Sequence, residues 1–252
     1  MVLIKLDGTF NTRDLGCYPN KDNRFIKPNL LYRSDKLYRL TDKDIEKIHD
    51  LGIKRIIDFR SKNEKNKYPN REIKGIEYIE YEINADKNFS EEIKLILNNN
   101  KDPKNFLTEA NKEFILNFQH IYSMFLKDII RYKEPTLFHC SAGKDRTGLA
   151  TVLIYLILDV DLDIILKDYM KSNEYLKDDI TSYMKMMKEE YNIPDNKCKM
   201  MKPLCGVDLQ YIKTALDAML TLPGVNNYND YLKKYLGINS YIKNEFNDYL
   251  LL

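Results

Sequence analysis

The chain has 252 residues, and its 40 Lys and Arg against 38 Asp and Glu give a formal net charge of +2. This length lets one α/β domain bury a substantial core without a second domain, and the near-neutral charge gives no electrostatic argument for nucleic acid as a partner. No apolar segment typical of a signal peptide opens the chain, and the longest apolar run, 149–158, is too short to span a bilayer. We therefore expect a cytoplasmic protein, or one exported without a visible signal peptide, with no stable membrane insertion.

Predicted helices and strands alternate in the first half of the chain. Residues 41–51 form a predicted helix that Thr41 can cap and Gly52 ends. Residues 53–59 follow as a buried strand, and 76–83 alternate apolar and charged positions as a second strand. Such alternation indicates an α/β fold with a mainly parallel sheet, in which ligands bind at the carboxyl ends of the strands.

The segment 85–131 is predicted to be a helical insertion. Its first part is polar, and Ser90 can cap a short helix that runs through Leu97. From 105 to 131, aromatic and aliphatic residues recur at helical spacing, which predicts one helix. The insertion could be a mobile lid over the site or a static addition, and the sequence leaves both open.

The most informative segment connects a short β-prone run, 136–138, to the apolar helix predicted from 149 onward. It places Cys140 six residues before Arg146, at a strand-to-helix turn where backbone N–H groups and the helix dipole favour an anion. In such a place the pKa of a cysteine can fall well below its usual value of about 8.5, which leaves a nucleophilic thiolate. The planar guanidinium of Arg146 can hold two phosphate oxygens at once. Of the four cysteines, only Cys140 has an arginine at this spacing.

The neighbours of Cys140 fit the same chemistry. Gly143 permits a tight turn with N–H groups directed at a bound phosphate. Thr147 can donate its hydroxyl to the sulfur, and His139 can bond nearby backbone and fix the orientation of the cysteine. The loop is not a nucleotide-binding P-loop, because the residue after Lys144 is an aspartate. The expected phosphate-binding residues, besides Arg146, are Ser141, Ala142, Gly143 and Lys144.

The rest of the chain adds helices and few further signals. Residues 161–252 look wholly helical. The four cysteines lack the spacing of a metal site, so neither a metal nor another cofactor is expected. Cys17 could protect Cys140 through a reversible disulfide, although a space-filling role explains it as well.

The run from His139 to Gly148 resembles the signature of the bacterial atypical tyrosine-protein phosphatase family, His-Cys-x-x-Gly-Lys-Asp-Arg-Thr-Gly. This resemblance implies one phosphatase-like domain over 1–252, with a mainly parallel central sheet flanked by helices, a lid-like helical insertion and a helical C-terminal part. Arg13, Arg33 and Arg60 lie in matching blocks and are candidates for structuring the site or touching substrate, although plain salt bridges would explain them as well. The other blocks that resemble the family, in chain order, are 11–16, 31–35, 56–61 with Glu64, 168–176 and 231–237.

The resemblance implies a cysteine-dependent phosphomonoesterase that acts on phosphotyrosine proteins, phosphoinositides or both. Cys140 would attack phosphorus and form a phosphocysteine, while Arg146 and the loop N–H groups stabilise the equatorial oxygens. Asp145 is the preferred general acid, by similarity to the myotubularins, although it could merely pair with a nearby cation such as Lys144. Asp58 and Asp86 are the alternative acids, and Asp58 is better suited to brace the loop.

Lys144 bears on the substrate, because the similar lysine of the tensin-homologue lipid phosphatase suits a second phosphate. It would not exclude phosphotyrosine.

Three other function classes compete. A catalytically silent phosphate-binding module would need no acid, a sulfurtransferase or arsenate reductase does not predict the run from Gly143 to Gly148, and a structural interaction protein explains none of these residues.

Overall fold

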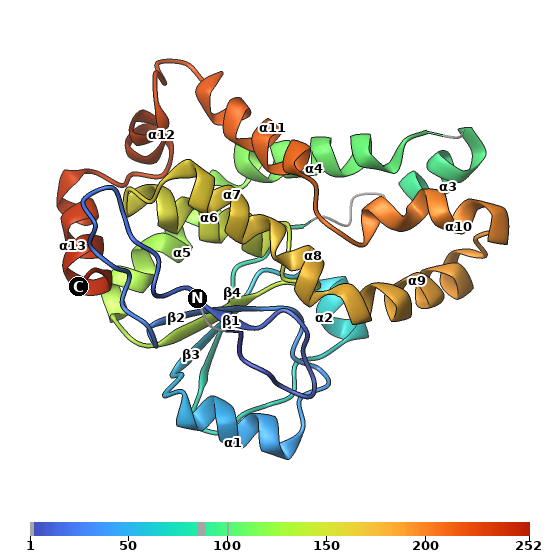
Figure 1. The fold of residues 1–252 in the computed structure, drawn as a ribbon, viewed down its shortest axis with the longest axis horizontal. Helices are drawn as coiled ribbons and strands as arrows, with labels where there is room; N and C mark the ends of the chain where they lie inside the picture. Colours follow the sequence, from blue (N-terminus) through green and yellow to red (C-terminus); the bar gives the residue numbers. More distant parts are fainter. Residues whose placement is uncertain (1–2, 85–88, 100) are drawn as a thin grey trace.

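The computed structural model describes residues 3–84, 89–99 and 101–252 (Figure 1). A five-stranded sheet has the order β1-β2-β5-β3-β4, in which β1 pairs antiparallel with β2 and the other neighbours pair parallel. The fold is therefore α/β with a mainly parallel sheet, as predicted. The strands are β1 (Arg13–Asp14), β2 (Leu31–Ser34), β3 (Arg55–Asp58), β4 (Glu77–Glu80) and β5 (Thr136–His139).

Helices cover both faces of this sheet and extend beyond it (Figure 1). Before β5 they are α1 (Asp42–Asp50), α2 (Lys62–Lys67), α3 (Phe89–Asn99), α4 (Pro103–Asn117) and α5 (Gln119–Tyr132). After β5 they are α6 (Arg146–Ile157), α7 (Leu162–Met170), α8 (Ser172–Tyr175), α9 (Lys177–Tyr191), α10 (Asp195–Met201), the 3₁₀ turn η1 (Lys202–Leu204), α11 (Leu209–Leu220), α12 (Tyr228–Tyr235) and α13 (Ser240–Leu250). The helical C-terminal part is confirmed.

Successive residues of the central strands point to opposite faces of the sheet and pack into two separate cores. Leu137 of β5 packs in a cluster with Ile48 of α1, whereas Phe138 packs in the larger cluster that α5 and α6 cover from the opposite face. Every residue of β2, β3 and β5 is buried, because a parallel strand with helices on both faces exposes neither side. Edge strand β4 is only partly buried.

The predicted helix over 105–131 is in fact two helices. The backbone leaves the helical region at Phe118 (φ −114°, ψ 25°), which ends α4 and begins α5. Helix α4 lies along α11 and reaches the main core through Phe114 and Ile115, and α5 joins the same core through Tyr122, Phe125 and Ile129. Helical spacing continued across the break because the apolar residues on both sides are buried in this core.

A third, smaller core lies away from the sheet. It joins α3 and α4 to the segment from α9 through α11, and these helices lie together beyond the sheet in Figure 1. Its buried members include Ile96, Leu107, Met187 and Leu204. The helical part of the chain is therefore divided between the main core and this satellite core.

Candidate active site

The carboxyl ends of three parallel strands meet at one place. His139 at the end of β5 is paired in register with Ser34 of β2 on one side and Asp58 of β3 on the other. The loop 140–145 leaves β5 there and leads into α6, all of whose residues are buried. The buried, apolar helix therefore holds its N-terminus at this edge of the sheet.

Groups from the N-terminal part of the chain hold the loop carbonyls from outside. The Asn11 side-chain amide donates to the carbonyls of Ala142 and Gly143, at 3.1 Å each. Arg33 Nη2 also donates to the Gly143 carbonyl, at 2.6 Å, and the Lys36 N–H donates to the Ser141 carbonyl at 3.1 Å. The N–H groups of 141–145 donate to none of the residues that the structure describes. They are consequently available to an anion.

Gly143 allows the loop to pass close to β2. Its φ is +65°, and a Cβ built on it would lie 2.4 Å from the Ser34 carbonyl oxygen. Only glycine fits both the backbone angle and this approach.

His139 is placed to hold Cys140 in position. Cys140 is buried, with only 2 % of its surface exposed. The Nδ1 of His139 lies 3.2 Å from the Cys140 carbonyl oxygen, and its Nε2 lies 3.1 Å from the Asn70 side-chain nitrogen. The Asn70 oxygen accepts from Arg60 at 2.7 Å, which directs its amide toward His139. Burial lowers the pKa of His139 below its ordinary value. A neutral ring that donates from Nδ1 and accepts at Nε2 satisfies all of these contacts.

Asp58 and Arg60 form a buried brace beside this histidine. Arg60 Nη2 lies 2.7 Å from Asp58 Oδ2, and the Arg60 N–H donates to Oδ1 at 2.9 Å. Burial would raise the pKa of Asp58, but the positive charge that His139 carries once protonated in acid and the contacts of Arg60 hold it at about 2. A carboxyl that is ionised at nearly all pH values has no proton to donate, so the geometry fits the bracing role rather than the acid role.

Glu64 holds the guanidinium of Arg146 in a two-point ion pair. The Nη1–Oε2 and Nη2–Oε1 distances are 2.6 and 2.7 Å. Burial would lower the pKa of Arg146, but the carboxylate raises it above its ordinary value. Burial would likewise raise the pKa of Glu64, which Arg146 and the Ser141 hydroxyl hold at about 2. The sequence alone assigns no role in the site to Glu64. Ser61-x-x-Glu64 is nevertheless a capping-box pattern, and the structure shows that box at the start of α2.

Arg13 lies in a second buried network, with Arg33 and Asp168 of α7. Arg33 Nη1 lies 3.3 Å from Asp168 Oδ2, and Arg13 Nε lies 3.6 Å from Oδ1. Arg13 also donates to the Asn11 side chain. Burial and the neighbouring Arg13 lower the pKa of Arg33 to about 10. Arg13 thus acts on the loop through Asn11, and Arg33 acts on it directly.

The loop lysine extends toward the residues at and after η1. Lys144 Nζ donates to the carbonyls of Leu204 and Gly206 at 2.9 and 2.7 Å, and lies 3.3 Å from Asp145 Oδ2. The Asp145 carboxylate also accepts from the Asn111 side chain at 3.3 Å. In this conformation Lys144 ties the loop to η1, and Asp145 has the ion pair that the sequence analysis raised as the alternative to an acid role.

The Thr147 hydroxyl is buried and has no hydrogen-bond partner among the described residues. The predicted bond to the Cys140 sulfur is therefore not made here, and the hydroxyl is the kind of unpaired donor that a newly charged acceptor would satisfy. Asp86, the third candidate acid, lies outside the described residues. Cys17 is exposed, whereas Cys140 is buried.

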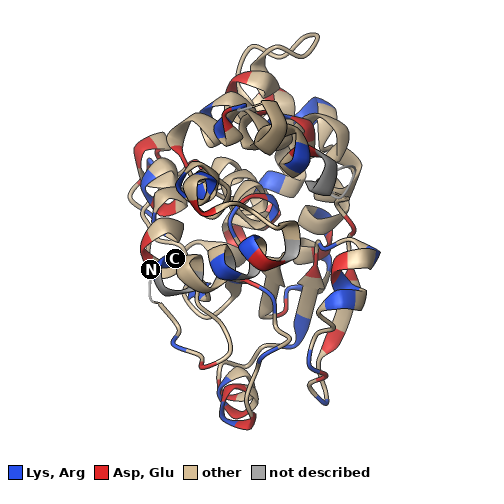
Figure 2. Ribbon diagram, turned by 90° about the vertical axis from the view of Figure 1, so that its right-hand side faces the viewer, with Lys and Arg blue, Asp and Glu red and all other residues tan. Residues whose placement is uncertain are grey.

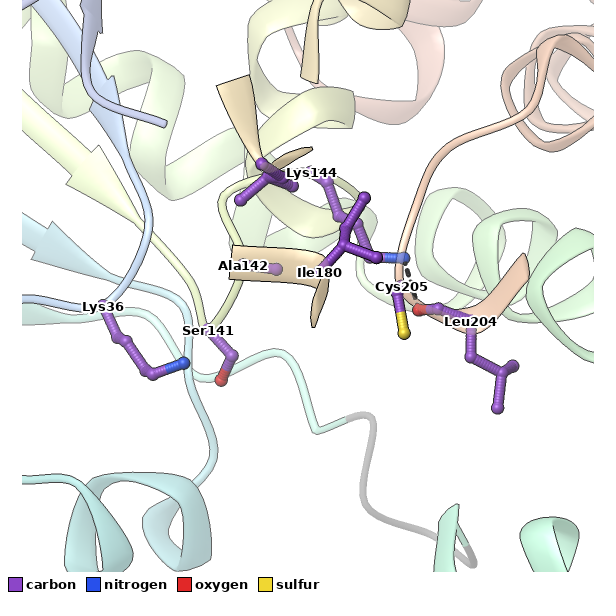
Figure 3. A pocket seen from close by; sticks show the side chains of 8 residues that line it. Lys36, Ser141, Ala142, Lys144, Ile180, Leu204 and Cys205 are labelled. Carbon is purple, nitrogen blue, oxygen red and sulfur yellow. Dashed lines mark hydrogen bonds between the residues drawn. The ribbon is translucent and has the colours of Figure 1, made fainter. Parts of the chain in front are cut away.

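A pocket of about 50 Å³ lies beside the loop (Figure 3). Ser141, Ala142 and Lys144 line it from the loop, whereas Cys140 and Arg146 are not among its lining residues. Lys36 lies on one side, and mostly apolar residues in or next to α9 and η1 close it on the other. The lining residues are Lys36, Ser141, Ala142, Lys144, Leu176, Ile180, Leu204 and Cys205.

The described residues contain no group of three or more His, Cys, Asp or Glu side chains arranged to hold a metal ion. None of their helices is both long and apolar enough to cross a membrane.

Comparison with known proteins matches nearly the whole chain to one family. The sequence profile of the tyrosine phosphatase family aligns with residues 4–251. A relative from Cupriavidus necator is 27% identical over 174 residues, which span 68% of this chain and 63% of that protein. The triple specificity protein phosphatase PtpB of Mycobacterium tuberculosis is 24% identical over 246 residues, with 85% of this chain and 88% of PtpB covered. Among solved structures, the catalytic core of Siw14 from S. cerevisiae covers 68% of this chain and 79% of its own, at 15% identity and a TM-score of 0.38. With the profile aligned over residues 4–251, the chain belongs to the tyrosine phosphatase family.

Proposed function

We propose that this protein is a cysteine-dependent phosphomonoesterase that hydrolyses phosphotyrosine in proteins. The observation that carries the proposal is the loop around Cys140, whose carbonyls are held outward while the N–H groups of 141–145 have no partner among the described residues. A phosphoryl group supplies the acceptors that such N–H groups need. PtpB, the relative matched over 85% of this chain, is itself named a protein phosphatase.

In the proposed mechanism, Cys140 attacks phosphorus in line and the bond to the leaving oxygen breaks. Arg146, oriented by Glu64, and the loop N–H groups stabilise the charge on the equatorial oxygens. Thr147 donates its unpaired hydroxyl to the sulfur when that sulfur becomes the leaving group. Water then cleaves the phosphocysteine and releases inorganic phosphate.

Asp145 is the proposed general acid that protonates the leaving oxygen. Its side chain is 16 % exposed, enough to reach a substrate at the mouth of the loop. For this role the Asp145–Lys144 ion pair must open, or the carboxyl must take up a proton while still beside Lys144. General acid catalysis typically contributes about 10²–10⁴-fold to the rate.

Hydrolysis of p-nitrophenyl phosphate between pH 4.5 and 8, with EDTA present, tests the proposal. We expect turnover that Cys140→Ser abolishes and that Asp145→Asn lowers, with a changed acidic limb in the pH–rate profile. A phosphotyrosine peptide should give the larger effect for Asp145→Asn, because its leaving group needs the proton more than nitrophenolate does.

The second candidate is a phosphate-binding module without catalysis, which the tight Arg146–Glu64 pair and the unpaired loop N–H groups would also serve. It predicts no turnover at any pH, together with binding of phosphate or vanadate that Arg146→Met abolishes. Phosphoinositides are the alternative substrate within the first candidate. Turnover of a soluble phosphoinositide, measured beside the phosphotyrosine peptide, decides between the two.

A further inference from the structure

The pocket beside the loop has two unlike walls. On one side Lys36 lies beside Ser141 of the loop, and on the other side Leu204 and Cys205 face it across the pocket (Figure 3). Leu176 and Ile180 complete the second wall with aliphatic side chains. A substrate group that enters here therefore meets an apolar surface and one ammonium group.

Of the two lysines in this pocket, Lys144 is already engaged. Its ammonium donates to two carbonyls and pairs with Asp145, and the residue is 5 % exposed. An ammonium with three protons and three close acceptors has no donor left for substrate. Lys144 therefore does not supply the positive charge of the pocket in this conformation.

Lys36 is differently placed. Its Nζ lies 5.7 Å from the ring centre of Tyr38 and 5.6 Å from that of Tyr68, and these rings are 5.0 Å apart. Both distances fall within the range of cation–π attraction. Among the described residues, Lys36 Nζ makes no hydrogen bond and no ion pair, and its backbone N–H is fixed to the Ser141 carbonyl. The rings thus hold, at the edge of the loop, a charge that forms no ion pair with the described residues.

Two more cations extend this arrangement along the surface. The Arg39 guanidinium carbon lies 4.9 Å from the Tyr38 ring centre, and Lys67 Nζ lies 5.5 Å from that of Tyr68. Arg39 and Lys67 are both exposed. We call these five residues the Lys36 patch: Lys36, Tyr38, Arg39, Lys67 and Tyr68. Elsewhere the charges are mixed, with Lys and Arg interspersed among Asp and Glu over the ribbon in Figure 2.

We propose that the Lys36 patch binds acidic residues next to the phosphotyrosine of a peptide substrate, with Lys36 as the residue that determines this preference. The inference rests on the proposed phosphatase function. The aliphatic wall of Leu176, Ile180 and Leu204 matches an aromatic leaving group, and Lys36 matches a carboxylate beside it. A multiply phosphorylated inositol ring is hydrated on all sides and would need cations on both walls, whereas Lys144 is held by carbonyls.

The test compares two phosphotyrosine peptides that differ only at their flanking residues, Glu-Glu in one and Gln-Gln in the other. The measured quantity is the ratio of their kcat/KM values, which is independent of any general loss of activity. An exposed charge pair contributes up to about 1 kcal/mol, so we expect the native protein to prefer the acidic peptide by about three- to fivefold. High salt should weaken this preference by screening.

Variants then assign the preference to Lys36. We expect Lys36→Gln to bring the ratio close to one, and Lys36→Glu to invert it. Arg39→Gln should reduce the ratio less, because Arg39 lies farther along the patch and not in the pocket. Lys213→Gln, at an exposed position of α11, is the matched control and should leave the ratio unchanged.

The outcomes separate this inference from the proposed function. Failure of the native protein to hydrolyse either peptide or p-nitrophenyl phosphate would overturn the phosphatase proposal, and this inference with it. Turnover with the same ratio in the native protein and in Lys36→Gln would overturn the role of Lys36 alone. A Lys36→Gln variant that loses turnover of a soluble phosphoinositide while its peptide ratio stays native would assign the charge to lipid headgroups and overturn the peptide preference.

Discussion

At the scale of single residues, the site depends on one carboxylate. Glu64 accepts from both terminal nitrogens of Arg146, from the Ser141 hydroxyl and from the Ser61 N–H. Each of these contacts favours the charged form of Glu64, which is why its pKa lies near 2 despite burial. The Glu64 carboxylate therefore caps α2, orients the Arg146 guanidinium and, through the Ser141 hydroxyl, links the loop to both of them.

We predict that Glu64→Gln destabilises the protein at neutral pH much more than at low pH. Because the folded-state pKa of Glu64 is lowered to about 2, its contribution is fully present above the unfolded value of 4.5 and is lost as pH falls from 4.5 toward 2. The loss at pH 7 should be on the order of 2 kcal/mol. Urea unfolding of the native protein and of Glu64→Gln at pH 7 and pH 3 measures this loss of stability.

Glu109→Gln is the control for this measurement. Glu109 is 62 % exposed and pairs with Lys112 on the surface of α4, so its loss should change stability little at either pH. A Glu64→Gln penalty that is equal at pH 7 and pH 3 would show that hydrogen bonding alone, and not charge, carries the contribution of Glu64.

At the scale of elements, the shape of the loop between β5 and α6 depends on contacts with β2, the neighbouring strand. β2 supplies Arg33 and the Ser34 carbonyl that Gly143 approaches, and the segment after it supplies the Lys36 N–H. Asn11 completes this set just before β1. The loop curvature is thus a tertiary property, set by donors that lie more than a hundred residues earlier in the chain.

We predict that Gly143→Ala costs more stability and far more activity than Gly52→Ala. Both glycines have a positive φ, so each substitution carries a backbone penalty of about 1 kcal/mol. At Gly52 nothing lies within 4 Å of the added methyl, whereas at Gly143 it meets the Ser34 backbone at 2.4 Å. The displaced loop should lose activity on the order of tenfold or more.

Thermal unfolding and p-nitrophenyl phosphate turnover of the two variants make the comparison. Equal losses in both would mean that backbone strain alone matters at Gly143 and that the loop tolerates displacement from β2.

At the scale of the whole molecule, two bodies of packing meet at the loop 140–145. The main core holds the sheet with α5, α6 and most of α11, and the satellite core holds α3, α9 and α10 with one end of α4 and of α11. Lys144 joins the second body to the loop through the Leu204 and Gly206 carbonyls. The lid predicted for 85–131 remains a prediction, and only α3 and the first turns of α4 can belong to it, because Phe114 and Ile115 of α4 and the buried face of α5 lie in the main core.

We predict that the satellite core can be loosened without unfolding the sheet. Met187→Ala removes a fully buried side chain of α9 and should cost about 2–5 kcal/mol within this core. Hydrogen exchange should then accelerate in α9 and α10 and stay native in β5 and α6. Leu153→Ala, which removes a fully buried side chain of α6, should instead accelerate exchange throughout the main core. Uniform acceleration by Met187→Ala would show that the two cores unfold as one.

The local sequence pattern was sufficient to predict those elements whose burial and chemistry depend on residues close together in the chain. The strand at 53–59, the helix capped by Thr41 and the strand–loop–helix around Cys140 all agree with the structure. β2 escaped notice because Arg33 and Ser34 are polar yet fully buried, which only their partners across space explain. The helix break at Phe118 was not predicted, because buried apolar residues recur at the same helical spacing on both sides of it.

The sequence by itself determined the α/β class, the family resemblance and the identity of the loop that carries Cys140 and Arg146, because these depend on periodicity and on residues a few positions apart. Only the tertiary structure decided that Glu64 holds Arg146, that Asn70 and Asp58 lie against His139, and that carbonyls of the described residues engage the Lys144 ammonium but not that of Lys36. The physical reason is that charges and hydrogen-bond donors act over a few ångströms in space. Their partners are therefore fixed by how the strands and helices pack, and not by distance along the chain.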